Sequence, residues 1–213
     1  MNGGKFVELE RVAGPVSRET FERLLAFEKL FVKWAARINL TAPSTISEIW
    51  NRHILDSAQL VRLAPDALDW VDLGSGGGFP GAVIAILMAD KPGGQVRLVE
   101  SNNKKCAFLR AALSEIGLRP DVYPVRIETI IFGWRPPQVV TARALAPLSR
   151  LLALTEPWLS AGTRALFHKG EEYRGEIKLA DDTWNLDLVE HPSMVDPCGV
   201  ILDITGIERR RAR

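Results

Sequence analysis

The feature that most constrains this chain is a glycine-rich turn between a short apolar strand and a helix. Residues 70–73 form the expected strand, which runs directly into the string Gly-Ser-Gly-Gly-Gly-Phe-Pro-Gly at 74–81. Pro80 stands where the helix over 82–88 would begin, a position that proline favours. Glycine has no Cβ, so Gly74 and Gly76 can take backbone angles denied to other residues and let a ligand approach the main chain. The order strand, glycine turn, helix is typical of a nucleotide-binding sheet.

An acidic residue stands at the end of the next expected strand. Residues 95–99 form that strand and Glu100 follows it, where a carboxylate can accept hydrogen bonds from a ribose diol. The Gly-Lys-Ser/Thr ending of a phosphate-binding loop is absent, and the glycine spacing differs from the usual dinucleotide turn. Asp72, at the head of the turn, suits a cofactor with an ammonium group. The prediction is S-adenosylmethionine; the alternative is that Asp72 and the glycines only shape a tight turn.

Strands and helices alternate along the rest of the chain, and residues 1–16 are expected to be loose. The pattern predicts helices over 17–38, 45–63 (with Thr45 and Glu48 as a capping box), 103–116 and 148–159, and strands over 121–125, 138–142, 163–167, 184–190 and 200–207. This alternation predicts an α/β fold with a mostly parallel, doubly wound sheet and an antiparallel C-terminal hairpin. We expect residues 1–65 to be an N-terminal helical extension packed on a main domain of residues 66–213.

Composition excludes several classes of protein. The 213 residues include 27 Lys and Arg against 26 Asp and Glu, a formal net charge of +1, so the chain is not a broadly basic nucleic-acid binder. An RNA partner would have to meet a local patch. No apolar run approaches the roughly 20 residues of a membrane-spanning helix, and no cluster of Cys and His predicts a metal site. Two distant cysteines indicate a reducing, cytoplasmic setting, and we expect a monomer.

Longer strings resemble one family. Five strings are similar in order and spacing to those of the 16S ribosomal RNA guanine-N7 methyltransferases, called RsmG or GidB. They are Asp72-Leu73 with the 74–81 string, His53-Ile54-Leu55-Asp56-Ser57, Val99-Glu100-Ser101, Arg143-Ala144-Leu145-Ala146 and Lys169-Gly170. These are Rossmann-like class I S-adenosylmethionine-dependent methyltransferases, and the likeness covers about Phe27 to Gly170. It implies a bacterial, cytoplasmic enzyme that methylates N7 of a single guanine, guanine 527, in 16S RNA of the small ribosomal subunit (30S).

The expected cofactor contacts combine the turn with positions that the resemblance implies. Those implied are Gly74, Phe79, Ile127, Glu128 and Arg143, with Glu100 and Ser101 on the ribose side. The whole set is Asp72, Gly74, Ser75, Gly76, Gly78, Phe79, Glu100, Ser101, Ile127, Glu128 and Arg143. Arg143 is also expected to position the base; the alternative is a helix-start arginine paired with a carboxylate. The family often has a serine shortly before this arginine, where this chain has Thr141.

Guanine N7 carries a lone pair and no proton, so we expect alignment to drive the reaction and no general base. The candidate RNA contacts are Arg52, His53, Lys104, Lys105, Arg110 and Lys169, together with the arginines of the C-terminal run at 209–213. His53 and Asp56 share one side of a helix and either cap the cofactor or hold the helix on the sheet.

Two other functions stay open: a class I methyltransferase of a small molecule or protein, and a catalytically inactive, cofactor-binding ribosome assembly factor.

Overall fold

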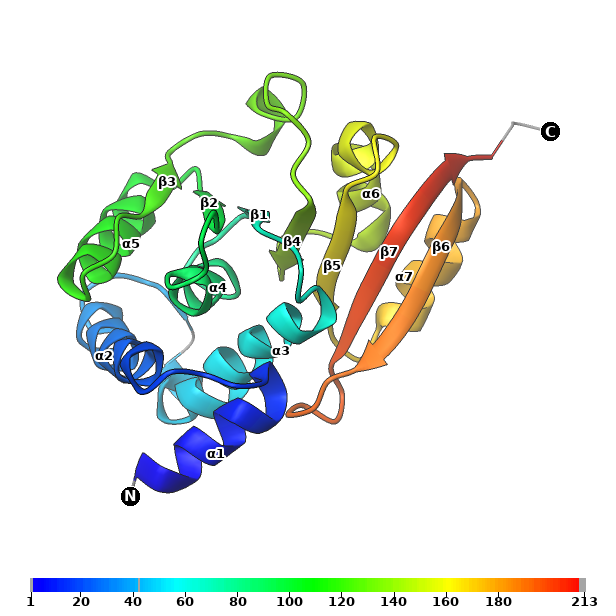
Figure 1. The fold of residues 1–213 in the computed structure, drawn as a ribbon. Coiled ribbons are helices and arrows are strands. Elements are labelled where there is room, and N and C mark those ends of the chain that lie inside the picture. The colour runs from blue at the N-terminus through cyan, green and yellow to red at the C-terminus, as the bar shows by residue number, and fades with distance from the viewer. Residues whose placement is uncertain (1, 42, 211–213) are drawn as a thin grey trace.

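A computed structural model describes residues 2–41 and 43–210, and Figure 1 shows their fold. Helices and strands alternate after a helical start, as expected for an α/β protein. In chain order the elements are α1 (Asn2–Ala13), α2 (Arg18–Ala35), the 3-10 helix η1 (Pro43–Glu48), the π-helical segment η2 (Trp50–Leu55), α3 (Asp56–Leu63), β1 (Asp69–Leu73), α4 (Gly81–Met88), β2 (Gln95–Val99), α5 (Asn103–Glu115), β3 (Asp121–Tyr123), the 3-10 helix η3 (Ile127–Thr129), β4 (Val139–Arg143), α6 (Leu148–Leu159), β5 (Arg164–Lys169), α7 (Tyr173–Asp181), β6 (Trp184–Pro192) and β7 (Val200–Arg209).

All seven strands form one sheet in the order β3-β2-β1-β4-β5-β7-β6. The first five strands along this order are parallel, while β7 is antiparallel to both β5 and β6. This confirms the mostly parallel, doubly wound sheet with an antiparallel C-terminal hairpin. The chain moves outward in one direction from β1 to β3 and then restarts on the other side of β1 with β4. The strand order therefore reverses between β1 and β4, which is where open α/β sheets bind ligands.

Strand register sets the glycine turn beside the ends of its neighbours. Leu73, the last residue of β1, is level with Val99 of β2 and Ala142 of β4. The residues that follow these strands therefore leave the sheet at one edge. They include Gly74 and Glu100, which the sequence singles out for cofactor binding.

The two faces of the sheet carry separate apolar cores because successive strand side chains point to opposite faces. Trp70 and Leu98 face α1 to α5, whereas Val71 and Val99 face α6 and α7. On the first face, aromatic rings join the N-terminal helices to the sheet helices: Phe31 of α2 lies 5.9 Å from Phe108 of α5 between ring centroids. The division at residue 65 stays a prediction.

Two α-helices were not expected from the sequence. The N-terminal residues form α1 instead of a loose segment, because Leu9 and Val12 are fully buried against the first core. That packing outweighs the low helix propensity of two glycines near its start. Helix α7 was also missed, because only Ala180 of its nine residues is buried and charged residues obscure its apolar side.

The helix expected over 45–63 is divided into η1, η2 and α3. Thr45 therefore lies inside η1 and is not an N-cap, which corrects the capping-box prediction. Its hydroxyl is 2.8 Å from that of Thr41. By contrast, Ser17 caps α2 as the helix boundary suggests: its Oγ accepts from the Thr20 amide at 3.0 Å. Among the described residues, no helix is both long and apolar enough to cross a membrane.

Candidate active site

The glycine turn follows β1 in a conformation that few other residues could adopt. Gly74 has φ of +70° and Gly76 has φ of +52°, in the left-handed region that glycine enters without strain. Space is also limited at Gly74, because a Cβ there would lie 2.6 Å from a methyl carbon of Leu145. The turn thus brings bare backbone against the segment that follows β4.

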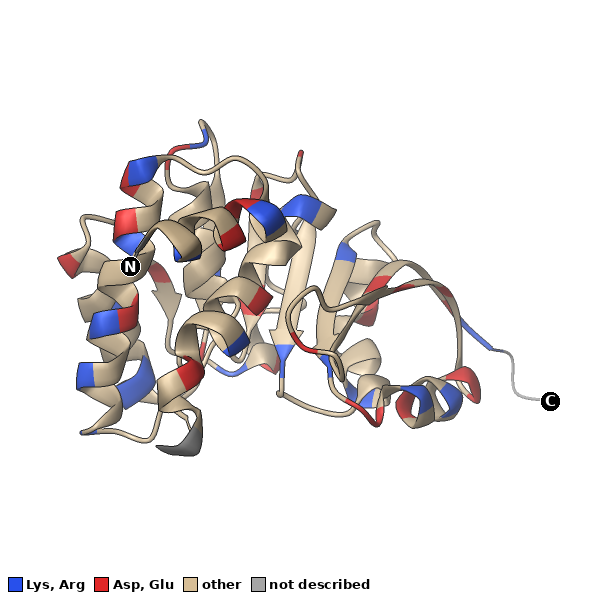
Figure 2. Ribbon diagram, turned by 90° about the horizontal axis from the view of Figure 1, so that it is seen from below, with Lys and Arg blue, Asp and Glu red and all other residues tan. Residues whose placement is uncertain are grey.

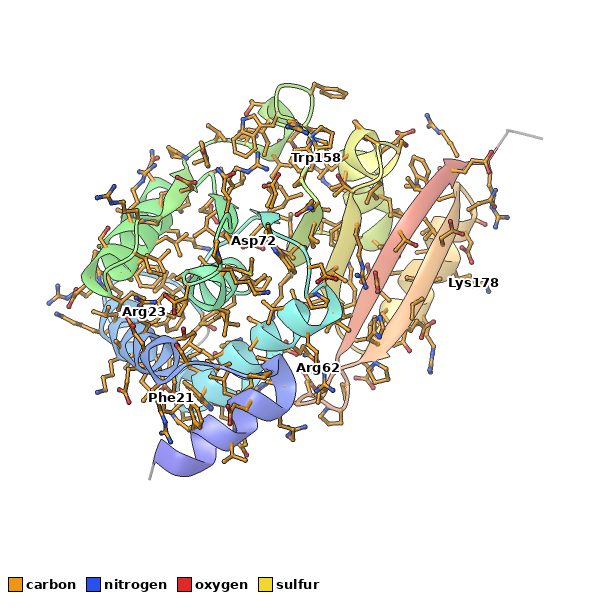
Figure 3. All side chains as sticks on the ribbon, viewed as in Figure 1. Phe21, Arg23, Arg62, Asp72, Trp158 and Lys178 are labelled. Carbon is orange, nitrogen blue, oxygen red and sulfur yellow. The ribbon has the colours of Figure 1, made fainter. Side chains whose placement is uncertain are left out.

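Asp72 lies beneath the turn rather than beside it, and Figure 3 shows it in the middle of the molecule. Its carboxylate is 1% exposed; it accepts from the Gly81 amide at 3.2 Å and from the Thr141 hydroxyl at 2.7 Å. Burial raises the pKa of Asp72 to about 6, although hydrogen bonds from Ser75 and Thr141 oppose the shift. In this position Asp72 shapes the turn and the start of α4.

A first hollow of about 430 Å³ opens beside the turn. Most of the expected cofactor residues line it, namely Gly74, Gly76, Glu100, Ser101, Ile127 and Glu128, along with Lys105. The turn residues Ser75, Gly78 and Phe79 do not line it, nor does Arg143. The hollow is therefore walled by the ends of β1 and β2 and by the segments that follow β3 and β4.

Glu100 is fixed in this wall by two backbone amides. Its Oε2 accepts from the Gly76 amide at 2.9 Å and its Oε1 from the Asn102 amide at 2.7 Å. An ionised carboxylate has about four acceptor sites, so two remain for a ligand. The side chain that the sequence assigns to a ribose diol is thus oriented with free acceptor capacity.

A second hollow of about 420 Å³ lies on the other side of Ala144 and Leu145, which line both hollows. Ala144 has φ of +50° although it is not glycine, and such strain is concentrated at functional sites. The other lining residues come from α3, from the ends of β4 and β5, from α7 and from the β6–β7 connection: Asp56, Arg143, Ala146, Pro147, His168, Lys169, Gly170, Glu176, Asp196 and Gly199.

A buried junction of charges joins α3 to the ends of β4 and β5 at this second hollow. Arg143 Nη1 lies 3.5 Å from Asp56 Oδ2, and its Nη2 donates to the Arg52 carbonyl at 2.9 Å. His168 Nε2 lies 3.0 Å from the Asp56 carbonyl oxygen, which can only accept, so Nε2 carries the proton. Burial lowers the pKa of His168 and keeps its ring neutral. Arg143 is thus paired with a carboxylate, as the second of its two interpretations from sequence expected, and it also lines the second hollow.

His53 faces the aromatic side of the site. Its ring stacks on Phe79 with centroids 4.9 Å apart, and Phe79 in turn lies 5.1 Å from Phe31. Burial, with the nearby positive charge of Arg143, lowers the pKa of His53 to about 4. Neither ring nitrogen has a hydrogen-bond partner among the described residues. His53 and Phe79 thus anchor η2 on the turn, while Asp56 turns toward Arg143.

The candidate RNA residues fall into two groups. Arg52 and Lys104 are exposed near the site, and Lys105 lines the first hollow, so the two adjacent lysines do diverge. In contrast, Lys169 donates to Glu176 at 2.6 Å and to the Ala146 carbonyl, and its side chain is 6% exposed.

Arg110 donates to the Val122 carbonyl and so ties α5 to β3. Of the C-terminal arginines, Arg209 and Arg210 belong to the described chain, and residues 211–213 lie outside it.

Sequence reasoning missed His168, Glu176 and Asp196 at the second hollow. His168 had a usable signal, because it is the next-to-last residue of a parallel strand that ends at the ligand-binding edge. Glu176 and Asp196 had none: they lie on an unexpected helix and in a connection between antiparallel strands. Within the described residues, no group of three or more Cys, His, Asp or Glu side chains is arranged to hold a metal.

Comparison with known proteins identifies the family. The family model described as GidB, rRNA small subunit methyltransferase G, matches residues 20–200. A Chelativorans protein named ribosomal RNA small subunit methyltransferase G is 57% identical over 98% of this chain and its own full length. A Brucella canis protein of the same name is 52% identical over 97% of each chain.

Solved structures share the fold at low sequence identity. A Bacillus cereus O-methyltransferase in complex with SAH has a TM-score of 0.55, at 14% identity, over 95% of this chain and 97% of its own. A ribosomal protein L11 methylase from Lactobacillus delbrueckii subsp. bulgaricus has a TM-score of 0.56, at 14% identity, over 75% and 79% of the two chains. The chain has the Rossmann-like class I methyltransferase fold, and it belongs to the rRNA small subunit methyltransferase G family.

Proposed function

We propose that this chain transfers a methyl group from S-adenosylmethionine to N7 of one guanine, guanine 527, in 16S ribosomal RNA. One observation carries the proposal beyond family membership: two hollows lie side by side at the carboxyl edge of the sheet and share Ala144 and Leu145 as their common wall. A cofactor in the first and a base in the second would meet at that wall.

The residues of the first hollow fit a nucleoside cofactor. The positive φ of Gly74 and Gly76 leaves backbone, without side chains, on one wall, and Glu100 keeps acceptor sites for a ribose diol. When bound, S-adenosylmethionine supplies an electrophilic methyl group on a sulfonium. The chain's part is to hold the cofactor with Glu100, Ser101 and the glycine turn, and to cover it with the segment around Ile127.

The second hollow has charges that suit a base becoming cationic. Three carboxylates (Asp56, Glu176 and Asp196) and two cations (Arg143 and Lys169) line it, so carboxylates are in excess while His168 stays neutral. Methylation at N7 removes no proton and leaves a positive charge on the ring. Fixed negative groups near a developing positive charge lower the barrier, provided that the site is already organised. Arg143 is the base-positioning residue in this proposal.

The test uses tritiated S-adenosylmethionine with 30S subunits, naked 16S RNA and 50S subunits in parallel. We expect label in the small-subunit RNA only, and mapping of the labelled nucleotide should find one N7-methylguanine. Comparing 30S with naked RNA also shows which of the two is the substrate. The absence of label in every RNA would overturn the proposal and favour a small-molecule or protein substrate, or a role in assembly without catalysis.

A further inference from the structure

The second half of α2 carries a stripe of cations. Lys29, Lys33 and Arg37 follow one another at intervals of four residues, so they share one face of the helix and of the turn that continues it. All three are exposed. Across the described ranges 2–41 and 43–210, none of these three side chains has an ion pair or hydrogen bond, although eight other Lys and Arg side chains of the chain are in ion pairs.

Acidic residues are missing from this stretch and from a second one. After Glu28 the next acidic residue is Glu48, and between Glu100 and Glu115 there is again none. The second stretch contains Lys104, Lys105 and Arg110. Two segments thus hold six cations and no carboxylate in a chain whose net charge is only +1. Charge is balanced over the whole protein but not locally.

The fold places these two segments side by side. Trp34 of α2 lies 5.8 Å from Phe108 of α5 between ring centroids, and Phe31 contacts the same ring. Figure 1 shows α2 and α5 together at one end of the sheet, and in Figure 2 blue bands of Lys and Arg lie on that side, with red bands of Asp and Glu among them. We call Lys29, Lys33, Arg37 and Lys104 the cationic ridge.

The ridge ends at the candidate active site. A Cβ added to Gly77 of the glycine turn would lie 2.8 Å from Phe31 and 3.3 Å from the Leu40 carbonyl, so the end of α2 abuts the turn. Helix α5 begins three residues after Glu100, and Asn102 caps it. A strand of RNA whose target base enters the second hollow would therefore have the ridge within reach of its flanking phosphates.

We propose that the cationic ridge is a docking surface for the phosphate backbone of the RNA substrate, outside the target nucleotide. Four residues of helix rise about 6 Å, close to the distance between neighbouring phosphates of one strand. Lysine and arginine at this spacing contact successive phosphates and carry no base preference. The inference rests on the proposed function, because it takes ribosomal RNA as the partner.

The test is the triple variant Lys29→Gln, Lys33→Gln, Arg37→Gln, which removes three charges with little change in size. Binding of 16S RNA is measured on filters with S-adenosylhomocysteine present, across a salt series, and methylation is measured separately. Each lost phosphate contact lowers the slope of log affinity against log salt by about 0.7–0.9, so the variant should lose about two to three units of slope. Its KM for RNA should rise, with kcat and cofactor affinity unchanged.

A matched control removes three exposed cations outside the ridge, one in the η3–β4 connection and two on α7: Arg135→Gln, Arg174→Gln, Lys178→Gln. It has the same change of net charge and should keep the wild-type slope. If both variants lose the same slope, RNA binding responds only to total charge, and the proposed role of the ridge is overturned. An unchanged slope and KM in the ridge variant also overturns it, as does a lower kcat with an unchanged KM. Failure of wild type to label RNA would count against the proposed function, while the filter assay still decides whether the ridge binds RNA.

Discussion

The two hollows lie next to each other but are built in different ways. The first is made largely of backbone: glycines with positive φ on one wall, and Glu100 held by amides within 24 residues of it along the chain. The second is made of charged side chains that meet from distant segments, as when Asp56 contacts His168, 112 residues away. The first hollow thus depends on local chain geometry, whereas the second depends on packing between distant segments.

This difference has a direct consequence for the effect of mutations. A backbone-built hollow should lose its ligand when the chain geometry changes, with modest loss of stability. A hollow built from a buried ion pair should lose stability first, because an unpaired buried charge is costly.

The largest expected effect is that of Asp56→Ala. The substitution leaves Arg143 and His168 without their carboxylate in a buried junction, and breaking such a pair costs about 3–5 kcal/mol. Urea unfolding at neutral pH measures the loss. Asp196→Ala is the control: Asp196 lines the same hollow and its charge acts on Arg143, but its carboxylate accepts from the Cys198 amide rather than from Arg143 or His168, so the loss should be less than about 1 kcal/mol. Equal losses in the two variants would mean that the junction does not hold the second hollow together.

The next largest effect is expected for Glu100→Gln, which should weaken cofactor binding. The amide has one oxygen for the two backbone donors of Gly76 and Asn102, so one donor faces an NH₂ group. Hydrogen bonds to charged groups contribute about 1.5–3 kcal/mol, which corresponds to roughly a 10–100-fold weaker binding. Calorimetry with S-adenosylhomocysteine measures it. Glu128→Gln, in the same hollow but exposed and 3.7 Å from Arg150, should change affinity less than twofold.

Gly74→Ala should have a smaller effect on stability. An alanine at φ of +70° costs about 1–2 kcal/mol, and its Cβ must also displace Leu145 from the shared wall. Gly162→Ala is the matched control, because Gly162 has φ of +94° and nothing within 4 Å of an added Cβ. We expect similar losses in thermal stability, but weaker S-adenosylhomocysteine binding in Gly74→Ala alone. Weaker binding in both would assign the effect to global destabilisation.

At neutral pH the smallest effect is that of His53, and it grows only as the pH falls. Because the native state holds the His53 pKa at about 4, the unfolded chain binds more protons between pH 6.5 and 4, and stability falls as pH falls through that window. His53→Gln should flatten this decline. Asp72 acts in the opposite direction, since its pKa is raised to about 6, but both proteins keep it. Urea midpoints at about pH 7, 5.5 and 4.5 measure the difference; parallel curves would contradict the prediction.

What could be predicted from sequence follows the same division. The glycine turn and Glu100 are close along the chain, so strand-turn-helix order was enough to place them in one hollow. Arg143 was assigned to the site, but His168 was not, although it lies near the end of a parallel strand; no pattern in the sequence shows that both side chains would meet the same residue, Asp56. Helix α1 was missed for a related reason: two buried side chains, Leu9 and Val12, decide its structure, and their packing partners lie far along the chain.

The aromatic contacts of α2 have a consequence for the order of events during synthesis. Phe27, Phe31 and Trp34 leave the ribosome well before Phe79 and Phe108, the rings that they pack against. Domains made by translation fold as units once their long-range contacts are available. The first helices must therefore wait, with exposed aromatic rings, for more than seventy further residues to be added. During that interval the nascent chain exposes an apolar helix face, which is the kind of surface through which incompletely folded chains aggregate.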